Sequence, residues 1–519
     1  MSGFFCLLIV LAPLLATLLI GSLHLLGLIS GEAGEKYSAK LALAGISLAF
    51  LSSLTLALQA TEPVYRYFCW LEIGRVQIEF GLFSGGFNLA LANLFAGLIL
   101  LVMRFSVNYM HREAGFHRWF FTLSLFATGM MLIVLSSNAV FSFVGWELAG
   151  VCSYWLIAYA YDRPQAANNA TRVFLTNRIG DGGFLFAMAL ALSWLGSADW
   201  LEINARIMDL SPADRHGLAA CFVLAAMAKS AQIPFTPWLA RALEGPTPSS
   251  ALFYGGVMIH SGVFLLIQLQ PVLESARWLM VLLLVVGGLT SAYSWFVGLT
   301  QTDVKSGHGF AISGQLGLMF VECGLGFWQL ASWHLAAHAV VRCYLLLTAP
   351  SILHVTAARP VQPVWPGLRH ARWAFMASLQ RGWLEPLLDA LLVKPVQQFS
   401  KDMLYVDKHI IKPVFATPVP VITGMANLAQ SREDKIGANL QSVQDSFAQG
   451  SGLAGKLTQW LAALMNGFEE HFILFGIGRN SIRFGRRLGH VANRFERLLL
   501  KPRFISLFVL ICLLVALGS

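Results

Sequence analysis

Long apolar runs separated by short polar stretches dominate the first two thirds of the chain. Each run has roughly 20 residues, enough for an α-helix to cross a hydrocarbon core of about 30 Å. The runs cover residues 4–30, 39–60, 83–105, 118–136, 138–161, 171–196, 217–244, 248–269, 276–299, 304–324, 328–353 and 504–518. The pattern predicts an all-α, polytopic membrane protein of about 12 transmembrane helices. A membrane β-barrel would instead show strands of roughly 10 alternating residues.

The composition fits this prediction, because 56% of the residues are hydrophobic and only 12% are charged. The first run has no cationic start, is too long for the apolar part of a signal peptide and lacks a clean cleavage site. We therefore expect it to be retained as a membrane span.

The chain changes character after residue 353, where proline-rich and basic sequence begins. Region 354–503 holds 19 Lys and Arg against 10 Asp and Glu, while the rest of the chain holds 17 of each, so the whole formal net charge of +9 lies there. Apolar residues recur in it near helical spacing. A basic amphipathic segment tethered between spans is typical of an arm that lies on anionic lipid. Nucleic acid is not the expected partner.

These changes divide the chain into four parts. They are N-terminal transmembrane helices (1–82), a transmembrane core (83–355), a basic amphipathic surface arm (356–503) and a C-terminal anchor helix (504–519).

Lys and Arg in the loops predict the orientation, because cytoplasmic loops carry an excess of them. If the N-terminus is outside, seven lie in inner loops and four in outer loops between the first six spans. The inner ones are Lys36, Lys40, Arg104, Arg112, Arg118, Arg163 and Arg172, and the outer ones are Arg66, Arg75, Arg206 and Arg215. Region 354–503 is then cytoplasmic, as expected for a bacterial-type inner membrane.

Motifs of soluble catalysis are absent from the sequence. The seven cysteines are scattered without a CxxC pair, and we find no Gly-rich dinucleotide motif, phosphate loop or GxSxG elbow. We therefore predict no catalytic residue, bound metal or cofactor in this chain. Whether the chain acts as an enzyme stays open, since redox or hydration chemistry would belong to partner subunits.

The informative residues are ionisable groups inside predicted spans, where each is costly unless paired or hydrated and is therefore a functional candidate. We expect a proton relay to use Glu147, Asp181, Lys229, His260, Lys305, His334 and His338, with Arg342 as a fixed charge.

Lys229 is the strongest candidate because Pro234 and Pro237 break its helix directly afterwards. Broken helices in a membrane are tolerated where they line a cavity or the protein interior. Burial disfavours the charged form of a lysine, so a nearby carboxylate decides whether it keeps its proton. Glu147 is the expected partner. The alternative is a purely structural salt bridge.

His334, His338 and Arg342 are spaced by four residues and therefore share one helix face. Such a row is typical of a proton relay, with a structural polar seam or a metal site as alternatives. No carboxylate lies nearby in sequence to complete a metal shell.

The remaining candidates are more ambiguous. Asp181 could be neutralised by Arg178, three residues earlier, and Lys305 could extend to the membrane interface. His260 is isolated among apolar residues and could be a packing residue. Glu322, near the far end of its span, is not included.

Several of these residues lie in segments that together resemble a known family. WELAGVCSYWLI, TNRIGD, KSAQIPFTPWLARALEGPTPSSAL, LTQTDVK and HLAAHAVVR are similar to the antiporter-like subunits of respiratory complex I, especially the subunit-5 type, and of Mrp antiporters and membrane hydrogenases. The resemblance covers roughly residues 85–355. It implies a proton- or sodium-translocating core of two inverted five-helix repeats, in which Glu147 pairs with Lys229 and in which Lys305, His334 and His338 form the central relay.

The chain departs from this family in three ways. Arg342 stands where the family usually has a lysine, and arginine effectively never releases its proton. Tyr254 follows the GPTPSSAL segment where the family has a histidine, and His260 lies six residues later. The second repeat looks incomplete beyond residue 355, so we expect a partner to complete the exit path.

The leading hypothesis is a proton-conducting subunit of a complex I-like energy-converting assembly. One alternative is the membrane subunit of a gradient-powered inorganic-carbon accumulating complex of the DAB type, which has a zinc-containing partner. Another is a degenerate homologue that serves as a scaffold. The expected partners are other antiporter-like, zinc-containing or redox subunits in a hetero-oligomer, anionic lipid at the arm, and protons or sodium ions.

Overall fold

The computed structural model describes residues 2–59, 62–74, 76–301, 303–349 and 370–407. In this part of the chain, nine helices are long and apolar enough to cross a membrane. They are α1 (Ser2–Leu25), α2 (Gly31–Ala57), α3 (Gly86–Tyr109), α4 (Phe116–Leu135), α5 (Ala139–Ile157), α6 (Pro164–Leu195), the interrupted segment Thr247–Gln268, α13 (Arg277–Gly298) and α15 (Trp328–Leu347). The predicted multi-pass, mainly helical membrane fold is confirmed.

Two of the predicted spans are helical but are not among these nine. α8 (Pro212–Lys229) stops at a break and is followed by the short α9 (Pro237–Ala242). α14 (Val304–Gly324) carries Lys, His, Gln and Glu side chains along its length, which lower its hydropathy. The predicted anchor, 504–518, lies outside the described residues.

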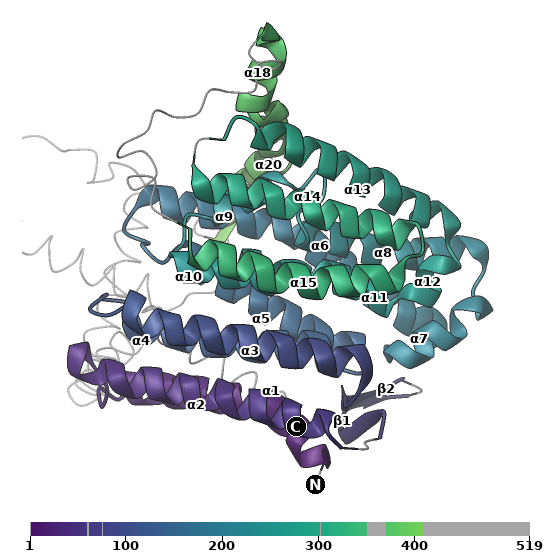
Figure 1. Ribbon diagram of the computed structural model, residues 1–519. Helices are drawn as coiled ribbons and strands as arrows, with labels where there is room; N and C mark the ends of the chain where they lie inside the picture. Colours follow the sequence, from purple (N-terminus) through teal and green to yellow (C-terminus); the bar gives the residue numbers. More distant parts are fainter. Residues whose placement is uncertain (1, 60–61, 75, 302, 350–369, 408–519) are drawn as a thin grey trace, which may run out of the picture. The chain divides into compact units, whose positions relative to one another are not determined.

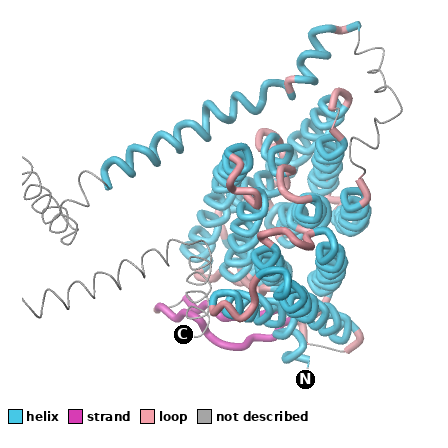
Figure 2. Tube along the Cα trace, turned by 90° about the vertical axis from the view of Figure 1, so that its left-hand side faces the viewer, coloured by secondary structure: helices cyan, strands magenta, loops and turns pink. Residues whose placement is uncertain are grey.

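Helix packing creates two groups of elements that matter for function. α4 lies at the centre of the N-terminal helices: all of its residues except Arg118 are buried, and it contacts α1, α2, α3 and α5. α5 and α8 both pack on α6, and α14 packs between α13 and α15. Figure 1 shows the helices lying side by side, and Figure 2 views them along their axes.

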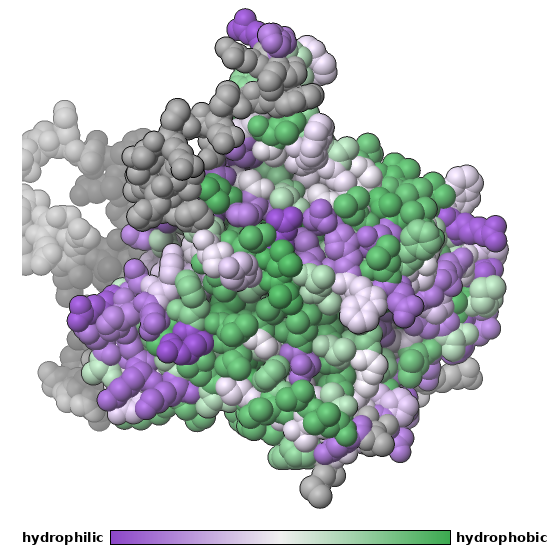
Figure 3. All heavy atoms as spheres, viewed as in Figure 1, coloured by the Kyte–Doolittle hydropathy of each residue, from purple (hydrophilic) through white to green (hydrophobic). Residues whose placement is uncertain are grey.

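The surface of α13 is strongly apolar, as expected for a helix that faces lipid. Its large exposed hydrophobic side chains are Trp278, Val281, Leu282, Val285, Leu289 and Trp295. Figure 3 shows hydrophobic residues over much of this side of the molecule, with hydrophilic residues gathered between them.

A β-hairpin, which the sequence pattern did not predict, joins α2 to α3. β1 (Val64–Ile73) pairs antiparallel with β2 (Val76–Phe83). Ile78, Phe80 and Leu82 are buried, so the apolar positions alternate with a period of two. The two helices expected within residues 1–82 are thus followed by a hairpin, which gave no signal in the sequence because such short strands carry no long apolar run.

The break after Lys229 leaves backbone groups that other segments satisfy. The carbonyl of Ala231 accepts from the Ser313 hydroxyl at 3.2 Å, and the N–H of Ile233 donates to the Thr290 hydroxyl at 3.0 Å. The indole of Trp238 donates to the carbonyl of Ala228 at 2.8 Å. These contacts allow non-helical backbone at membrane depth.

A second break interrupts the segment Thr247–Gln268, which we predicted as one span. It consists of α10 (Thr247–Ser249), a π-helical stretch (Ser250–Gly256), a 3-10 turn (Met258–His260) and α11 (Ser261–Gln268). A methyl group added to Gly262 would lie 2.4 Å from the carbonyl oxygen of Ala226, so only glycine allows α11 to pack this closely on α8. The two interrupted segments therefore touch each other.

Of the predicted surface arm, only residues 370–407 are described. They form α18 (Arg372–Leu379), α19 (Leu384–Leu388) and α20 (Lys394–Val406), with short 3-10 and π turns between them. On α20, Val396, Phe399 and Met403 are exposed and recur at helical spacing, which gives the helix an apolar side.

Candidate functional site

Four ionisable side chains from α5, α6 and α8 meet in the interior. We call Glu147, Arg178, Asp181 and Lys229 the Lys229 cluster. Lys229, the last residue of α8, is only 1% exposed; its Nζ donates to the Trp146 carbonyl at 3.2 Å and lies 4.8 Å from the centre of that indole ring. Asp181 accepts from Nε1 of Trp146 at 2.6 Å, and its Oδ2 lies 2.7 Å from Nη2 of Arg178.

The partner of Glu147 differs from our prediction. Its carboxylate pairs with Nη1 of Arg178, whereas the hydrogen bond of Lys229 goes to a backbone carbonyl. Arg178 lies one helical turn before Asp181 on α6, so a single guanidinium reaches both carboxylates. Glu147 therefore interacts directly with Arg178, a residue that the sequence analysis considered only as a neutraliser of Asp181.

Gly150 on α5 leaves room for two cations. A methyl group added to it would lie 3.2 Å from Nη2 of Arg178 and 3.7 Å from Nζ of Lys229. The cluster thus combines two positive with two negative side chains at full ionisation, and the carbonyl end of α8 adds partial negative charge beside Lys229. Protonation of either carboxylate leaves an excess of positive charge next to the lysine.

A second polar group lies where α15 faces α14 and the second break. We call His260, His334, His338, Arg342 and Glu322 the histidine row. Nε2 of His260 and Nδ1 of His338 are 2.8 Å apart, and both rings are buried. Nδ1 of His334 lies 2.8 Å from Glu322, and Nε of Arg342 donates to Nε2 of His338 at 3.3 Å.

The donors fix the tautomers of one part of the row. Arginine can only donate, so Nε2 of His338 accepts, and the proton of this neutral ring is on Nδ1. Nδ1 of His338 then donates to Nε2 of His260, which leaves the proton of His260 on Nδ1. That Nδ1 is buried and has no hydrogen-bond partner in the described chain. The hydrogen bonds therefore run in one direction, from Arg342 to His260.

His334 forms a separate pair although it shares a helix face with His338. Its ring is held between Glu322 and Gln315, with Nε2 3.0 Å from Oε1 of Gln315. The centres of the His334 and His338 rings are 6.1 Å apart, which is beyond hydrogen-bond contact. From the sequence we set Glu322 aside and did not consider Gln315, because both lie on the neighbouring helix, α14.

Lys305 lies apart from the histidines with which we grouped it. It is in the first turn of α14, and its Nζ donates to the carbonyl of Gly245 at 3.4 Å. His260, which appeared isolated in the sequence, is instead the direct partner of His338. The grouping of the central residues therefore needs correction: His260 replaces Lys305 beside His338.

The Lys229 cluster and the histidine row are connected through the two breaks. The hydroxyl of Ser230, next to Lys229, donates to the carbonyl of Ile259, next to His260, at 2.7 Å. Polar atoms near the breaks that are buried and without a hydrogen-bond partner in the described residues are Gln232 Oε1, Thr236 Oγ1, Ser250 Oγ, His260 Nδ1 and Ser261 Oγ. Buried polar atoms of this kind commonly bind ordered water.

Two family models match the chain. The model for the transmembrane region of NADH:quinone oxidoreductase and Mrp antiporters matches residues 136–362, and the model for the N-terminus of chain 5 of complex I matches residues 70–120. The first match contains both the Lys229 cluster and the histidine row. The chain belongs to this antiporter-like family.

Individual relatives of this antiporter-like chain support the same family. Subunit 5 of the chloroplast NAD(P)H-quinone oxidoreductase of Nephroselmis olivacea is 36% identical over 324 residues, 60% of this chain and 50% of the relative. The same subunit of Cryptomeria japonica is 32% identical over 390 residues, 71% of this chain and 52% of the relative. The chain thus spans about half the length of these relatives.

The fold of the antiporter-like chain also has a solved counterpart. A chain in the structure of the Mrp complex from Dietzia sp. DQ12-45-1b superposes with a TM-score of 0.58 at 24% identity, covering 65% of this chain and 37% of that one. At this identity, the similarity supports the fold alone.

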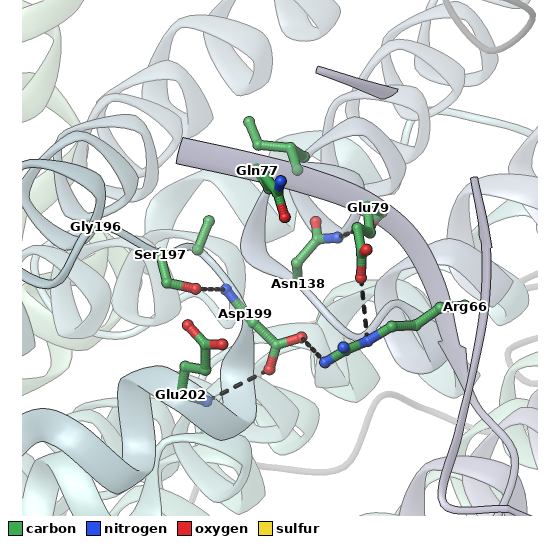
Figure 4. A pocket seen from close by; sticks show the side chains of 10 residues that line it. Arg66, Gln77, Glu79, Asn138, Gly196, Ser197, Asp199 and Glu202 are labelled. Carbon is green, nitrogen blue, oxygen red and sulfur yellow. Dashed lines mark hydrogen bonds and ion pairs between the residues drawn. The ribbon is translucent and has the colours of Figure 1, made fainter. Parts of the chain in front are cut away.

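A cavity of about 200 Å³ lies beside the hairpin of the antiporter-like chain. Figure 4 shows Arg66 between two carboxylates, with Nε 3.2 Å from Glu79 and Nη2 3.8 Å from Asp199. Burial raises the pKa of Asp199, while the N–H groups of Leu201 and Glu202 and the charge of Arg66 act in the opposite direction. The lining residues come from separate segments, so no sequence motif indicated the cavity.

The described ranges contain no group of three His, Cys, Asp or Glu side chains arranged to hold a metal ion. The six cysteines among them form no disulfide.

Proposed function

We propose that this chain is a proton-translocating subunit of a complex I-like membrane assembly, with Lys229 as the group that takes up and releases the proton. One observation carries the proposal: a charge-balanced cluster, in which Lys229 and Asp181 are buried, lies at the end of a broken helix and is joined through Ser230 and Ile259 to a hydrogen-bonded histidine pair. Broken membrane helices commonly build such ion sites.

The composition of the cluster explains how it would work. Arg178 is a fixed positive charge, because guanidinium does not deprotonate in proteins. When a proton enters on Glu147 or Asp181, the two cations lose one of their two compensating charges. The free energy of keeping Lys229 protonated then rises, which favours release of its proton. Return of the carboxylate to its ionised form would favour reloading.

The histidine row extends the hydrogen-bonded path beyond the breaks. Nδ1 of His260 holds the proton of that ring near the end of the Lys229 helix, so in this arrangement it is the nitrogen from which a proton moving along the bonds from His338 would leave. Neutral imidazoles accept a proton on one nitrogen and give it up from the other, so this pair suits protons rather than sodium ions.

The membrane location and the orientation follow from the charges of the loops and of region 354–503. We place the chain in a hetero-oligomeric complex of a bacterial-type cytoplasmic membrane, with the N-terminus outside and region 354–503 inside, where its basic arm binds anionic lipid. Neighbouring subunits supply the energy source and complete the path.

The test is proton flux through the purified complex reconstituted in liposomes with an internal pH-sensitive dye. Lys229→Ala should abolish flux while assembly is retained, and Lys229→Arg should also abolish it, because arginine keeps the charge without releasing a proton. Lys40→Arg, an exposed substitution on α2, is the matched control. Wild-type flux in the Lys229→Ala complex would overturn the proposal. A co-purified zinc protein that hydrates carbon dioxide would instead support the inorganic-carbon alternative.

A further inference from the structure

Three arginines converge on Glu385, the first acidic residue after the described chain resumes at residue 370. Its Oε1 lies 3.3 Å from Nη1 of Arg172 on α6 and pairs with Arg241 on α9, while Oε2 lies 4.0 Å from Nη1 of Arg381. Asp389, four residues later, pairs with Nη2 of Arg172. The side chains of Glu385 and Asp389 are only 16% and 17% exposed, so these ion pairs are largely sheltered from water.

The same segment is also bound to α13. Ser378 is fully buried; its hydroxyl donates to the carbonyl of Phe296 at 2.7 Å and lies 2.9 Å from the hydroxyl of Thr300. The hydroxyl of Tyr293 donates to the carbonyl of Arg381 at 2.8 Å. Residues 378–389 are therefore a docked element of the transmembrane core, which the prediction of a surface arm did not anticipate.

The docked element holds the helix that follows the Lys229 break. α9 has six residues, too few for a helix to be stable without tertiary contacts. One tie runs from Arg241 to Glu385, and a second runs from Glu244 to Arg163 at 3.2 Å. The break between Lys229 and α9 is therefore positioned from outside its own segment.

Glu385 joins α6, which contributes two residues to the Lys229 cluster, to α9, which follows the break after Lys229. Arg172 lies on α6, which also carries Arg178 and Asp181, whereas Arg241 lies on α9. Removal of the Glu385 charge leaves Arg172, Arg241 and Arg381 with Asp389 alone, so like charges would push α9 away from α6. A network of partly buried charges has larger effects than an isolated surface pair.

We propose that Glu385 is a positioning residue: it clamps α9 to α6 and thereby sets the geometry of the Lys229 break. Through this carboxylate the docked element is coupled to both α6 and α9. This inference rests on the proposed function, because its consequence for transport requires Lys229 to exchange protons.

Two measurements on the full reconstituted complex test the clamp. The first is proton flux per assembled complex as a function of pH for Glu385→Gln, Arg241→Gln and the double variant. The second is hydrogen exchange of the backbone amides of α9, which reports the clamp whether or not protons move. Asp209→Asn is the control, because it also removes one acid from an ion pair with arginine, but an exposed pair away from α9.

Glu385→Gln should lower flux about tenfold, shift its pH profile and speed exchange in α9, whereas Glu385→Asp should retain most of the flux. The double variant should lose no more than either single variant, because both remove the same contact. Unchanged exchange in α9 overturns the clamp. Faster exchange with wild-type flux and pH profile overturns the coupling to the proton site. Loss of flux in Glu385→Gln without any flux defect in Lys229→Ala contradicts the proposed function but not the clamp.

Discussion

The Lys229 cluster and the histidine row handle charge in opposite ways. In the cluster, two cations and two carboxylates lie between three helices, and one guanidinium touches both acids. In the row, His338 and His260 are joined as neutral rings, and the fixed charge of Arg342 is far from Glu322. Arg342 reaches the carbonyl of Ala311, eleven residues before Glu322 on α14, a rise of about 16 Å.

This difference indicates a division of labour. Adding or removing one proton changes the electrostatic balance of the whole cluster, so the cluster can act as a switch. The row changes only which nitrogen carries a proton, so it can pass a proton on without a large change in charge. Substitutions that keep charge but prevent proton exchange, or the reverse, should separate these two roles.

The largest effect should come from Arg178→Gln. It leaves Glu147 and the buried Asp181 without their shared guanidinium, and breaking a buried ion pair costs about 3–5 kcal/mol. We expect a marked loss of assembled, thermally stable complex and no measurable flux. Arg206→Gln, in an exposed pair with Asp209, should cost less than about 1 kcal/mol. Normal thermal stability of the Arg178→Gln complex would show that the cluster is not charge-balanced as described.

His338→Phe should affect transport more than stability. Phenylalanine fills the space of the ring but cannot carry a proton, so flux should fall about 100-fold, within the range for loss of a proton-transfer group. Loss of the bonds to His260 and Arg342 should cost about 1–3 kcal/mol. Flux and thermal unfolding of the same preparation provide the comparison, with His216→Gln, a half-buried residue near the start of α8, as the control. Wild-type flux in His338→Phe would exclude the row from the path.

Gly150→Ala should disturb the cluster without changing any charge. Its new methyl group would lie 3.2 Å from Arg178 and would displace the guanidinium by a few tenths of an ångström. We expect flux to fall about tenfold with assembly retained, because small displacements at a reaction site have large kinetic effects. Gly182→Ala on α6 has no atom within 4 Å of the added methyl and should behave as wild type. Equal flux in the two variants would mean that the position of the two cations is not critical.

The smallest effect should come from Arg342→Lys. Lysine keeps the positive charge and a donor for His338, but it can release its proton. Flux should stay within about threefold of wild type or increase, since a releasable carrier replaces a fixed charge. Loss of assembly would instead identify Arg342 as a structural ion-pairing residue.

The sequence indicated candidate residues more clearly than their partners. Lys229 was identifiable because a charge inside an apolar run and two nearby prolines are local signals. The other members of its cluster could not be identified in this way, since Arg178 on α6 pairs with Glu147 on α5, 31 residues earlier in the chain. In the same way, His338 was expected to act with His334 four residues away, yet its hydrogen bond goes to His260, 78 residues earlier.

Two structural features left weak traces or none in the sequence. The hairpin of β1 and β2 alternates over a few residues only, which a search for long apolar runs overlooks. The second break, at Val257, has no proline. The surrounding π and 3-10 turns are stable there because α8 and α15 pack around them, so the interruption depends on tertiary contacts.

The sequence by itself determined that the chain is a multi-pass membrane protein with costly charges inside its spans. The reason is that hydrophobic length and the presence of a charge are properties of one segment. Only the tertiary structure decided that Arg178 bridges Glu147 and Asp181, that His260 accepts a hydrogen bond from His338 and that Glu385 pairs with Arg241 on α9. A side chain's partner depends on which helices pack together and on how they are rotated, and that information is spread over the whole chain.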